Sequence, residues 1–522
     1  MTPPTDPGRP IALSLVSHTN AGKTTLARTL LGRDVGEVRD EAHVTETADA
    51  FTLVRTAEGD ALTLWDTPGF GDSARLARRL EQSGNPIGWF TMQVWDRFRE
   101  RALWSSQQAV RNVRDHADVV LYLVNAAEDP ADASYVEPEM RILDWVGKPV
   151  IALLNQMGPP RPPAHEAAEI ARWERHLAGS IMVRRVLALD AFARCWVQEG
   201  ALLEAVAAAM PAGRQPAFER LRHAWQAQRE QTFAASMQVL AQRLARAALD
   251  AETVAEGGLK DTLRNVGAAL GVGAALGLGR GKDEGSRRTA MRALAQRLDA
   301  DIRDGTDRLI ALHGLQGRAS QVVLARLAAH YAVTRRVGEG KAAILGGLVT
   351  GSLAGLKADI ATGGLTLGGG LIAGGIIGAI GAAGLARGYN LVRGTDAVSV
   401  TWTDAVLEDL VVSAVLGYLA VAHYGRGRGG WQASEHPPHW EGTVRAALAQ
   451  HLQPMAVLRA QRPRRPPVDA LAVALQPGLA ALTRDVLSRL YPATLAAAAA
   501  DRAAEPAATS RAPTDSPGAA AR

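Results

Sequence analysis

Residues 17–25 read Ser-His-Thr-Asn-Ala-Gly-Lys-Thr-Thr and decide how the N-terminal part of the chain folds. An apolar run, residues 11–16, precedes them and a helical pattern follows, so the order is strand, tight loop, helix. In that setting the pattern G-x-x-x-x-G-K-[ST] forms a phosphate-binding loop, because backbone N–H groups and a helix N-terminus face the anion. We expect Lys23 to reach the β- and γ-phosphates and the Thr24 hydroxyl to bind Mg²⁺. Ser17 replaces the first glycine of the pattern, a modest departure because that glycine mostly serves the turn.

The next apolar strand ends in Asp-Thr-Pro-Gly, residues 66–69. In this order after the P-loop, the turn predicts a D-x-x-G switch. Asp66 would hold Mg²⁺ through water, and the N–H of Gly69 would meet the γ-phosphate. A threonine in the polar loop between the two motifs is expected to complete the metal shell. Thr45 is our choice and Thr47 the reserve, because spacing does not separate them and either can also be a solvated loop hydroxyl.

Together these motifs resemble those of the Era/TrmE-like branch of the translation-factor-class GTPases. The resemblance rests on Asn-Ala-Gly-Lys-Thr at 20–24, Asp-Thr-Pro-Gly at 66–69 and Asp-Val-Val-Leu-Tyr-Leu-Val-Asn at 118–125, and it covers about the first two-fifths of the chain. It implies an α/β P-loop G domain with a mostly parallel sheet and flanking helices. It also implies hydrolysis of GTP and a switch that changes shape when the γ-phosphate leaves.

Two positions refine the hydrolysis that the resemblance implies. Phe70 follows the switch glycine, where Ras-like proteins carry a water-orienting glutamine, so intrinsic turnover should be slow. Asn20 matches a P-loop asparagine that holds K⁺ in some relatives, where the ion acts like an arginine finger; the same asparagine also occurs without K⁺ dependence. The expected cofactors are therefore Mg²⁺, held by Thr24, Thr45 and Asp66, and, as an open alternative, K⁺.

The base-reading motif departs from the family pattern. After an apolar strand, the resemblance leads us to expect Asn-Lys-x-Asp, but residues 155–158 read Asn-Gln-Met-Gly. Asn155 keeps the position that supports the loop, whereas Gly158 lacks the carboxylate that accepts two donors from guanine, which weakens discrimination. Asp190, after a later strand, is a candidate replacement; a helix-capping aspartate is the other interpretation. The predicted nucleotide-binding residues are Asn20, Ala21, Gly22, Lys23, Thr24, Thr25, Asn155, Asp190 and Ala191, and the predicted catalytic set is Lys23, Thr24, Asp66 and Gly69.

Composition narrows the class of protein. A chain of 522 residues is long enough for several domains. The net charge of +5 is small for this length. Arginines gather between residues 459 and 465 in a proline-rich stretch that could touch anionic lipid or nucleic acid, although linkers of this composition are usually just solvated. No nucleic-acid module accompanies the stretch, so nucleic acid is a minor hypothesis. The single cysteine, Cys195, excludes an internal disulfide and fits a reducing cytoplasm. The N-terminus holds no apolar signal core.

Beyond the G domain the pattern becomes helical. Apolar residues recur at helical spacing between residues 218 and 255, as on the core face of a bundle, and a second helical stretch runs roughly from 288 to 333. We divide the chain into a flexible N-terminus (1–9), the G domain (10–212), a helical region (213–341), a glycine-rich hydrophobic hairpin (342–386), a second helical region (387–493) and a disordered tail (494–522).

The glycine-rich segment is the second informative feature. Two uncharged runs, residues 342–356 and 365–386, carry glycine at every fourth residue, a spacing that lets helix backbones approach closely in lipid. In water each such glycine would cost about 1 kcal/mol relative to alanine. The first run is shorter than the roughly 20 residues of a full span, so we expect a shallow or re-entrant membrane hairpin. The alternative is a tightly packed pair of helices buried in a soluble bundle.

The sequence as a whole predicts a slow GTPase that acts as a molecular switch, with the helical half or a protein effector receiving the change. It is expected in the cytoplasm, and contact through residues 342–386 would place it at the inner face of the plasma membrane. A homodimer is implied by the resemblance only. Two other interpretations stay open. One is a membrane-associated scaffold that binds nucleotide but scarcely hydrolyses it; the other is an ATP-using P-loop NTPase, which Gly158 permits.

Overall fold

The apolar run before the P-loop forms β1 (Ile11–Ser17), a central strand of a six-stranded sheet. The structure is a computed structural model that describes residues 9–19, 21–32, 48–82, 101–157, 161, 163–189, 195–254, 280–315, 389–393, 398–423 and 439–492. The strand order is β2-β3-β1-β4-β5-β6, and every neighbouring pair is parallel except β2 with β3. The other strands are β2 (Asp49–Arg55), β3 (Ala61–Asp66), β4 (Val119–Asn125), β5 (Val150–Asn155) and β6 (Val183–Ala188).

Both faces of this sheet are buried because its central strands are mostly apolar. In β4, Val120 and Tyr122 belong to the core on one face, whereas Leu121 and Leu123 belong to the core on the other. This alternation is that of a parallel sheet covered on both sides. The helices on the first face are α2 (Ser73–Gln82), α5 (Arg101–His116), α6 (Val136–Val146) and α7 (Pro163–Leu177), and those on the second are α1 (Lys23–Leu31), α8 (Trp196–Ala209) and the first turns of α9 (Gln215–Leu249). The predicted α/β G domain is therefore confirmed.

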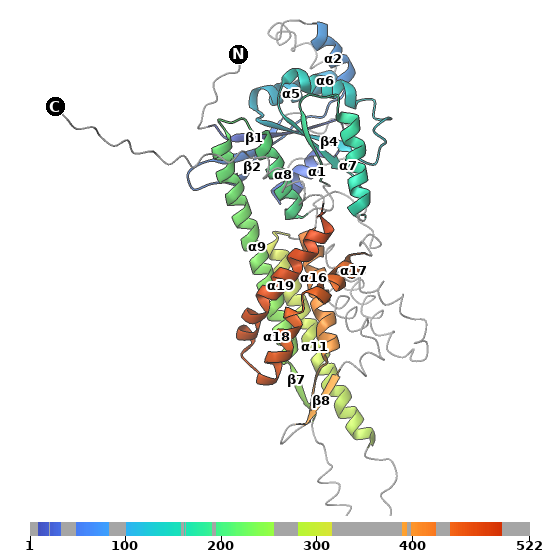
Figure 1. The fold of residues 1–522 in the computed structure, drawn as a ribbon, viewed down its shortest axis with the longest axis vertical. Helices are drawn as coiled ribbons and strands as arrows, with labels where there is room; N and C mark the ends of the chain where they lie inside the picture. The colour runs from blue at the N-terminus through green and yellow to red at the C-terminus, as the bar shows by residue number, and fades with distance from the viewer. Residues whose placement is uncertain are drawn as a thin grey trace, which may run out of the picture.

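Helix α9 is a continuous helix of 35 residues that joins the two parts of the molecule (Figure 1). Near its start, Phe218 and Leu221 pack into the core of the G domain. Farther along, Phe233, Met237 and Leu244 are buried in the core of the helical half. One rigid element thus takes part in both cores.

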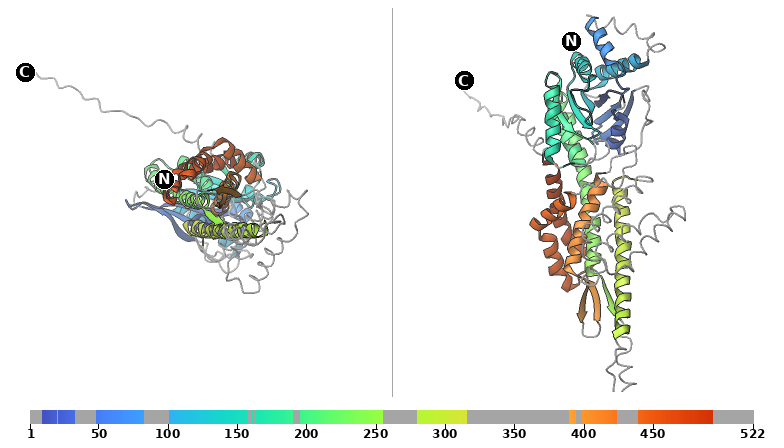
Figure 2. Two further views of the ribbon diagram at one scale, coloured as in Figure 1. Left: turned by 90° about the horizontal axis from the view of Figure 1, so that it is seen from below. Right: turned by 90° about the vertical axis from the view of Figure 1, so that its right-hand side faces the viewer.

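The helical half is an elongated bundle that extends away from the G domain (Figures 1 and 2). Helix α9 packs against α19 and α11 in it, and α16 packs against α17. This confirms the prediction of a mainly helical second half. The remaining helices are α11 (Arg280–Leu312), α16 (Asp404–Ala422), α17 (His439–Gln450), α18 (Gln453–Gln461) and α19 (Val468–Leu490), with a short 3₁₀ turn, η3 (Arg462–Arg464).

A small antiparallel sheet lies at the end of the bundle that is far from the G domain (Figure 1). Its order is β7-β9-β8, formed by β7 (Ala251–Val254), β8 (Tyr389–Arg393) and β9 (Val398–Trp402). The sequence analysis missed these strands, since four or five residues are too few for a clear period-two pattern. The helix predicted to continue to residue 255 ends at Leu249, and β7 follows it.

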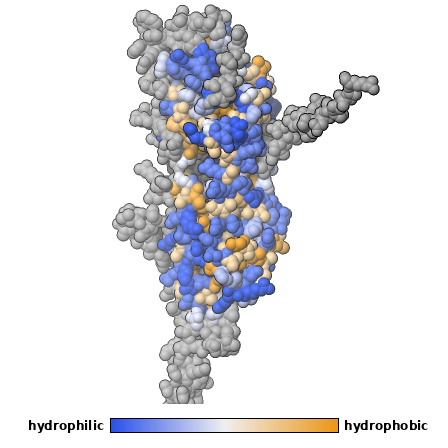
Figure 3. Space-filling model, turned by 90° about the vertical axis from the view of Figure 1, so that its left-hand side faces the viewer, coloured by the Kyte–Doolittle hydropathy of each residue, from blue (hydrophilic) through white to orange (hydrophobic). Residues whose placement is uncertain are grey.

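Two described helices are long and apolar enough to cross a membrane, α16 and α19. Both are packed in the bundle: 72% of the most apolar window of α16 and 50% of that of α19 are buried. The core helices of soluble proteins pass the same test of length and composition. On the side of the molecule shown in Figure 3, hydrophilic and hydrophobic residues are interspersed. The predicted hairpin, residues 342–386, and the predicted tail, residues 494–522, lie outside the described residues.

Candidate nucleotide-binding site

The loop between β1 and α1 is built around Gly22. Its φ of 89° lies in the left-handed region, and a Cβ atom there would come within 2.7 Å of Nδ2 of Asn155. A residue other than glycine would therefore be strained and would clash. The carbonyl of Gly22 accepts the N–H of Leu26 over 2.9 Å, so α1 begins directly after the loop. The backbone N–H groups of a helix's first turn are the groups that bind anions at such a place. Ala21 and Thr25 are buried beside Gly22, and Asn20 lies outside the described residues.

Lys23 is buried at the start of α1, where its Nζ donates a hydrogen bond of 3.1 Å to Oγ of Ser17. Burial lowers the pKa of Lys23, and the nearby carboxylates of Asp66 and Glu139 oppose that shift. The serine that departs from the usual glycine thus gives the ammonium group a hydroxyl partner. A desolvated cation at the base of an anion-binding loop is the electrostatic arrangement that a polyphosphate needs.

Asp66 ends β3 next to the start of α1. Its Oδ2 accepts a hydrogen bond of 2.6 Å from Oγ1 of Thr24, while Oδ1 is buried with no hydrogen-bond partner among the described residues. Burial raises the pKa of Asp66, and the hydrogen bond from Thr24 and the charge of Lys23 work against this. A buried carboxylate oxygen without a donor is costly unless a cation or water satisfies it. Carboxylate and hydroxyl oxygens are ligands that Mg²⁺ accepts, so Thr24 and Asp66 fit the predicted metal site; Thr45 lies outside the described residues.

The switch glycine lies against the phosphate-binding loop. A Cβ atom on Gly69 would stand 3.0 Å from Nζ of Lys23 and 3.0 Å from Cα of Thr19. The N–H of Phe70 donates to the carbonyl of Ser17 over 2.9 Å, and the N–H of Thr19 donates to the carbonyl of Phe70 over 3.3 Å. The two motifs, about fifty residues apart in sequence, are therefore joined by backbone hydrogen bonds. The ring of Phe70 is fully buried in the G-domain core.

On the base side, Asn155 ends β5 and is fully buried. Its Nδ2 donates a hydrogen bond of 2.8 Å to the carbonyl of Ala21, so the side chain supports the phosphate-binding loop. The next residue, Gln156, has a φ of 57°, in the left-handed region, and it turns the chain away from the strand. Three residues with predicted or questioned roles in base recognition lie outside the described residues: Gly158, Asp190 and Ala191.

The structure adds one group that the sequence analysis missed. Glu139 of α6 is fully buried and hydrogen-bonds to His18, the second residue of the phosphate-binding loop. A signal for it exists in the sequence: Glu139 lies one helical turn from Val136 and from Leu143, on the face of α6 that is buried. An acidic side chain on an apolar helix face requires a polar partner.

Comparisons with known proteins agree with this geometry. The sequence model of the family described as 50S ribosome-binding GTPase matches residues 12–156. GTPase Der of Azorhizobium caulinodans is 30% identical over 141 residues, which are 27% of this chain and 25% of that protein. This chain therefore covers about a quarter of the length of that curated relative.

Solved structures were also compared. A variant of Aquifex aeolicus Era bound to GDP and AlF₄⁻ is 18% identical with a TM-score of 0.26, and the match covers 34% of this chain and 50% of that one. A chain from an oligomerised bacterial dynamin pair, described as sensing and tethering membranes, is 10% identical with a TM-score of 0.23, covering 95% of this chain and 70% of that one. With TM-scores this far below 0.5, neither likeness bears on the function of this chain. The matched family and the sheet order with its two motifs identify the N-terminal part of this chain as an Era-like P-loop GTPase domain.

Proposed function

We propose that this protein is a switch that binds GTP and hydrolyses it slowly to GDP and phosphate. The observation that carries the proposal is the junction of the two motifs: Lys23, Thr24, Asp66 and Gly69 come from two distant segments and meet at one point. Phosphoryl transfer needs little covalent chemistry from the protein; positioning and charge stabilisation dominate. These four residues provide both.

Each side chain has a separate task in this scheme. The ammonium group of Lys23 stabilises the charge on the β- and γ-phosphates, and the N–H groups at the start of α1 bind the phosphate oxygens. Thr24 and Asp66 would hold Mg²⁺, which neutralises developing charge on the phosphates when it is bound. The N–H of Gly69 would meet the γ-phosphate, since this residue has no side chain and its Cβ position lies 3.0 Å from Nζ of Lys23.

The buried ring of Phe70 supports the proposal of slow turnover. Its side chain is 0% exposed, so it offers no group that could orient an attacking water. In GTPases with a glutamine at this place, that side chain orients the water, and a partner often supplies the further charge. We therefore propose that appreciable turnover of this protein requires K⁺, lipid or a protein partner.

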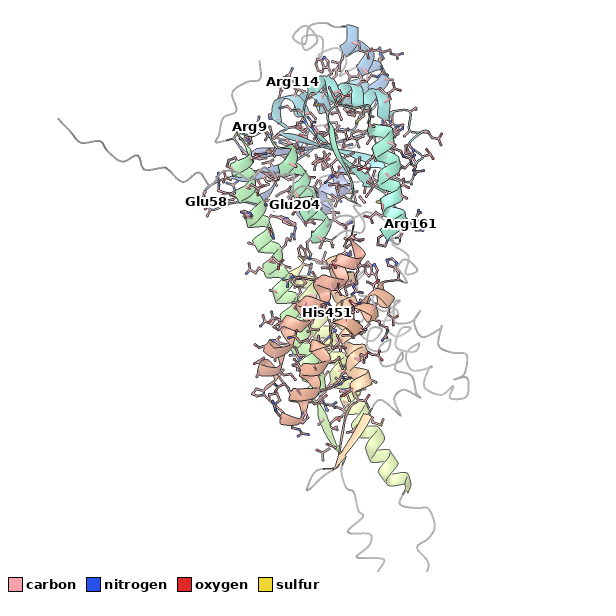
Figure 4. The ribbon with its side chains drawn as sticks, in the orientation of Figure 1. Arg9, Glu58, Arg114, Arg161, Glu204 and His451 are labelled. Atoms are coloured by element: carbon pink, nitrogen blue, oxygen red, sulfur yellow. The ribbon has the colours of Figure 1, made fainter. Side chains whose placement is uncertain are left out.

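Helix α9 is the proposed route from the G domain to the bundle. Arg214, the residue before this helix, forms a buried ion pair of 3.2 Å with Asp118 at the start of β4. Arg9 also contacts Asp118, over 3.4 Å, and lies on the same side of the G domain as the start of α9 (Figure 4). Because α9 is one continuous helix, a shift of the sheet relative to its first turns would move the bundle core.

We further propose that the protein acts in the cytoplasm at the inner face of the plasma membrane, with residues 342–386 as the contact. The support is the sequence pattern of uncharged, glycine-spaced runs. Fractionation of cell extract tests it: the protein should pellet with membranes and be released by detergent. Complete recovery in the soluble fraction without detergent would contradict the membrane role.

Competition binding tests the nucleotide proposal. Unlabelled GTP, ATP and XTP would compete with a fluorescent guanine nucleotide for the full-length chain, in Mg²⁺ with K⁺ or Na⁺, with Lys23→Ala as the control. We expect GTP to compete best and the control to lose binding. Equal competition by ATP would favour the ATP-using alternative, and unchanged binding by Lys23→Ala would contradict the use of this loop. Asp190→Ala would then test whether that carboxylate reads guanine.

A further inference from the structure

The side chain of Glu139 is fully buried between the sheet and the phosphate-binding loop. Its Oε2 accepts a hydrogen bond of 2.6 Å from the hydroxyl of Tyr122 on β4, and its Oε1 accepts one of 2.9 Å from Nδ1 of His18. Burial raises the pKa of this carboxyl group, and the hydrogen bonds from His18 and Tyr122 oppose that rise. A carboxyl group at such a place is costly, and an apolar residue would fill the space on α6 without that cost.

The imidazole ring of His18 is held on two sides. Glu139 fixes Nδ1, and the ring of Tyr135 stacks on it with centroids 4.4 Å apart and planes 21° apart. The position of Tyr135 is fixed in turn by a hydrogen bond of 3.0 Å that its hydroxyl donates to Oε2 of Glu128. Glu128 also accepts from Nδ2 of Asn125, at the end of β4. The start of the phosphate-binding loop is thus anchored by side chains from α6 and from the loop after β4.

The backbone of this anchored segment is what holds the switch turn. His18 and Phe70 pair as a parallel bridge, and the hydrogen bonds on either side of the bridge use the N–H of Thr19 and the carbonyl of Ser17. The residue before Phe70 is Gly69, and a Cβ atom on it would stand 3.0 Å from Nζ of Lys23 and 3.0 Å from Cα of Thr19. A displacement of His18 would therefore displace the segment that fixes Gly69.

Helix α6 also contacts the helix that follows the switch turn. Arg141 of α6 forms an ion pair of 3.2 Å with Glu81 of α2, and the apolar faces of these two helices share one core. Helix α6 therefore contacts the phosphate-binding loop through Glu139 and the last turn of α2, the helix after the switch turn, through Arg141.

We propose that Glu139 is a positioning residue for the γ-phosphate, acting through His18 to hold the phosphate-binding loop against Gly69. This inference rests on the proposed GTPase function and deepens it. It has a specific consequence for binding: the loop positions the contacts that only a triphosphate makes, so loss of the anchor should weaken the binding of a triphosphate more than that of a diphosphate. A merely structural role would weaken both equally.

The test compares affinity for GDP with affinity for a non-hydrolysable GTP analogue, together with single-turnover hydrolysis, in full-length protein. For Glu139→Leu we expect a loss of about tenfold or more for the analogue, in line with a lost hydrogen bond to a charged group, with a change of less than about threefold for GDP. Glu139→Gln keeps one acceptor oxygen and should be intermediate. The double variant His18→Ala with Glu139→Leu should lose no more affinity for the analogue than Glu139→Leu alone, because both changes break the same contact between α6 and the phosphate-binding loop.

The matched control is Asp144→Asn, at the other end of α6. Its carboxylate accepts from Oγ of Ser180 over 2.6 Å and from the N–H of Met182 over 3.0 Å, so the change costs stability without touching the loop. It should leave the preference for the analogue over GDP as in wild type. If Glu139→Leu does not fold, the comparison of Glu139→Gln with His18→Ala serves instead.

Three results would overturn the inference: equal losses for both nucleotides, additive effects of the two changes, or the same preference in wild type and Glu139→Gln. A wild-type chain that binds neither nucleotide would instead overturn the proposed function. The two kinds of failure are distinguishable, because each of the three results that overturn the role of Glu139 requires measurable nucleotide binding by the wild type.

Discussion

Oγ1 of Thr24 donates a hydrogen bond of 2.6 Å to Oδ2 of Asp66, which joins the first turn of α1 to the end of β3. The other oxygen of Asp66 is buried with no hydrogen-bond partner among the described residues. If that oxygen serves Mg²⁺, then Asp66→Asn should abolish the difference in GTP affinity between Mg²⁺ and EDTA, a loss of about tenfold or more in Mg²⁺. Thr24→Ser retains the hydroxyl and should keep most of the Mg²⁺ effect. Titration of a fluorescent nucleotide under both conditions measures this, and an unchanged Mg²⁺ effect in Asp66→Asn would contradict the assignment.

Two glycines with positive φ make a matched pair around α1. Gly22, before the helix, has a φ of 89°, and a Cβ there would stand 2.7 Å from Nδ2 of Asn155; Gly32, after it, has a φ of 65° and open space around its Cβ position. Gly22→Ala should displace Asn155 from the carbonyl of Ala21 and lower nucleotide affinity by about tenfold or more. Gly32→Ala carries only the backbone strain, about 1 kcal/mol of stability, and should bind nucleotide normally. Equal affinities in the two variants would show that the contact with Asn155 does not matter.

The parts of the site that could be predicted are those whose chemistry is local in sequence. The loop at residues 17–25 and the turn at 66–69 each hold the residues of their predicted role in one short stretch, and the strands before them are apolar enough to place both at one sheet edge. The hydrogen bond from Lys23 to Ser17 could not be predicted, because nothing in the sequence indicates it. Glu139 could not be paired from sequence because its partner His18 lies 121 residues away.

In the fold, too, features that are local in sequence could be predicted, and those formed by residues far apart in sequence could not. Long periodic helices such as α9 follow from their spacing of apolar residues, whereas β7 of the second sheet pairs with β9 across a sequence separation of more than a hundred residues. The buried pair of Arg214 and Asp118, 96 residues apart, is likewise invisible in a single sequence. Such contacts depend on tertiary packing, which local propensity does not encode.

Two of the ion pairs that attach α9 and the residue before it to the G domain differ in burial. Arg214 and Asp118 are 4% and 5% exposed, whereas Arg220 and Asp60 are 49% and 17% exposed. Arg214→Met removes the buried partner of Asp118, whose carboxylate keeps Arg9 and the N–H of Ala12, so we expect a loss of about 1.5–3 kcal/mol in the free energy of unfolding. Arg220→Met should cost no more than about 1 kcal/mol. Urea denaturation of both variants measures the difference, and similar losses in the two would contradict the idea that the buried pair fixes α9 to the sheet.

Two buried histidines make the helical bundle sensitive to acid. His423 directly follows α16, with its Nδ1 2.6 Å from the carbonyl oxygen of Leu419 and its Nε2 buried without a hydrogen-bond partner in the described part of the chain. Burial lowers the pKa of His423 and of His313 to about 4 each, and the charge of Arg229 adds to the effect on His313. The rings of Trp440 and Tyr491 pack on His423 and offer it no opposite charge.

The unfolded chain binds these two protons below about pH 6.5, whereas the folded chain binds them only below about pH 4. The free energy of unfolding should therefore be highest above pH 6.5. It should fall by up to ~3 kcal/mol per histidine as the pH drops to 4. His423→Leu removes one of the two groups and should reduce this slope by about half, with stability near that of wild type or somewhat lower at pH 8. Chemical denaturation at a series of pH values measures the slope, and an unchanged slope in His423→Leu would show that the proton binds elsewhere.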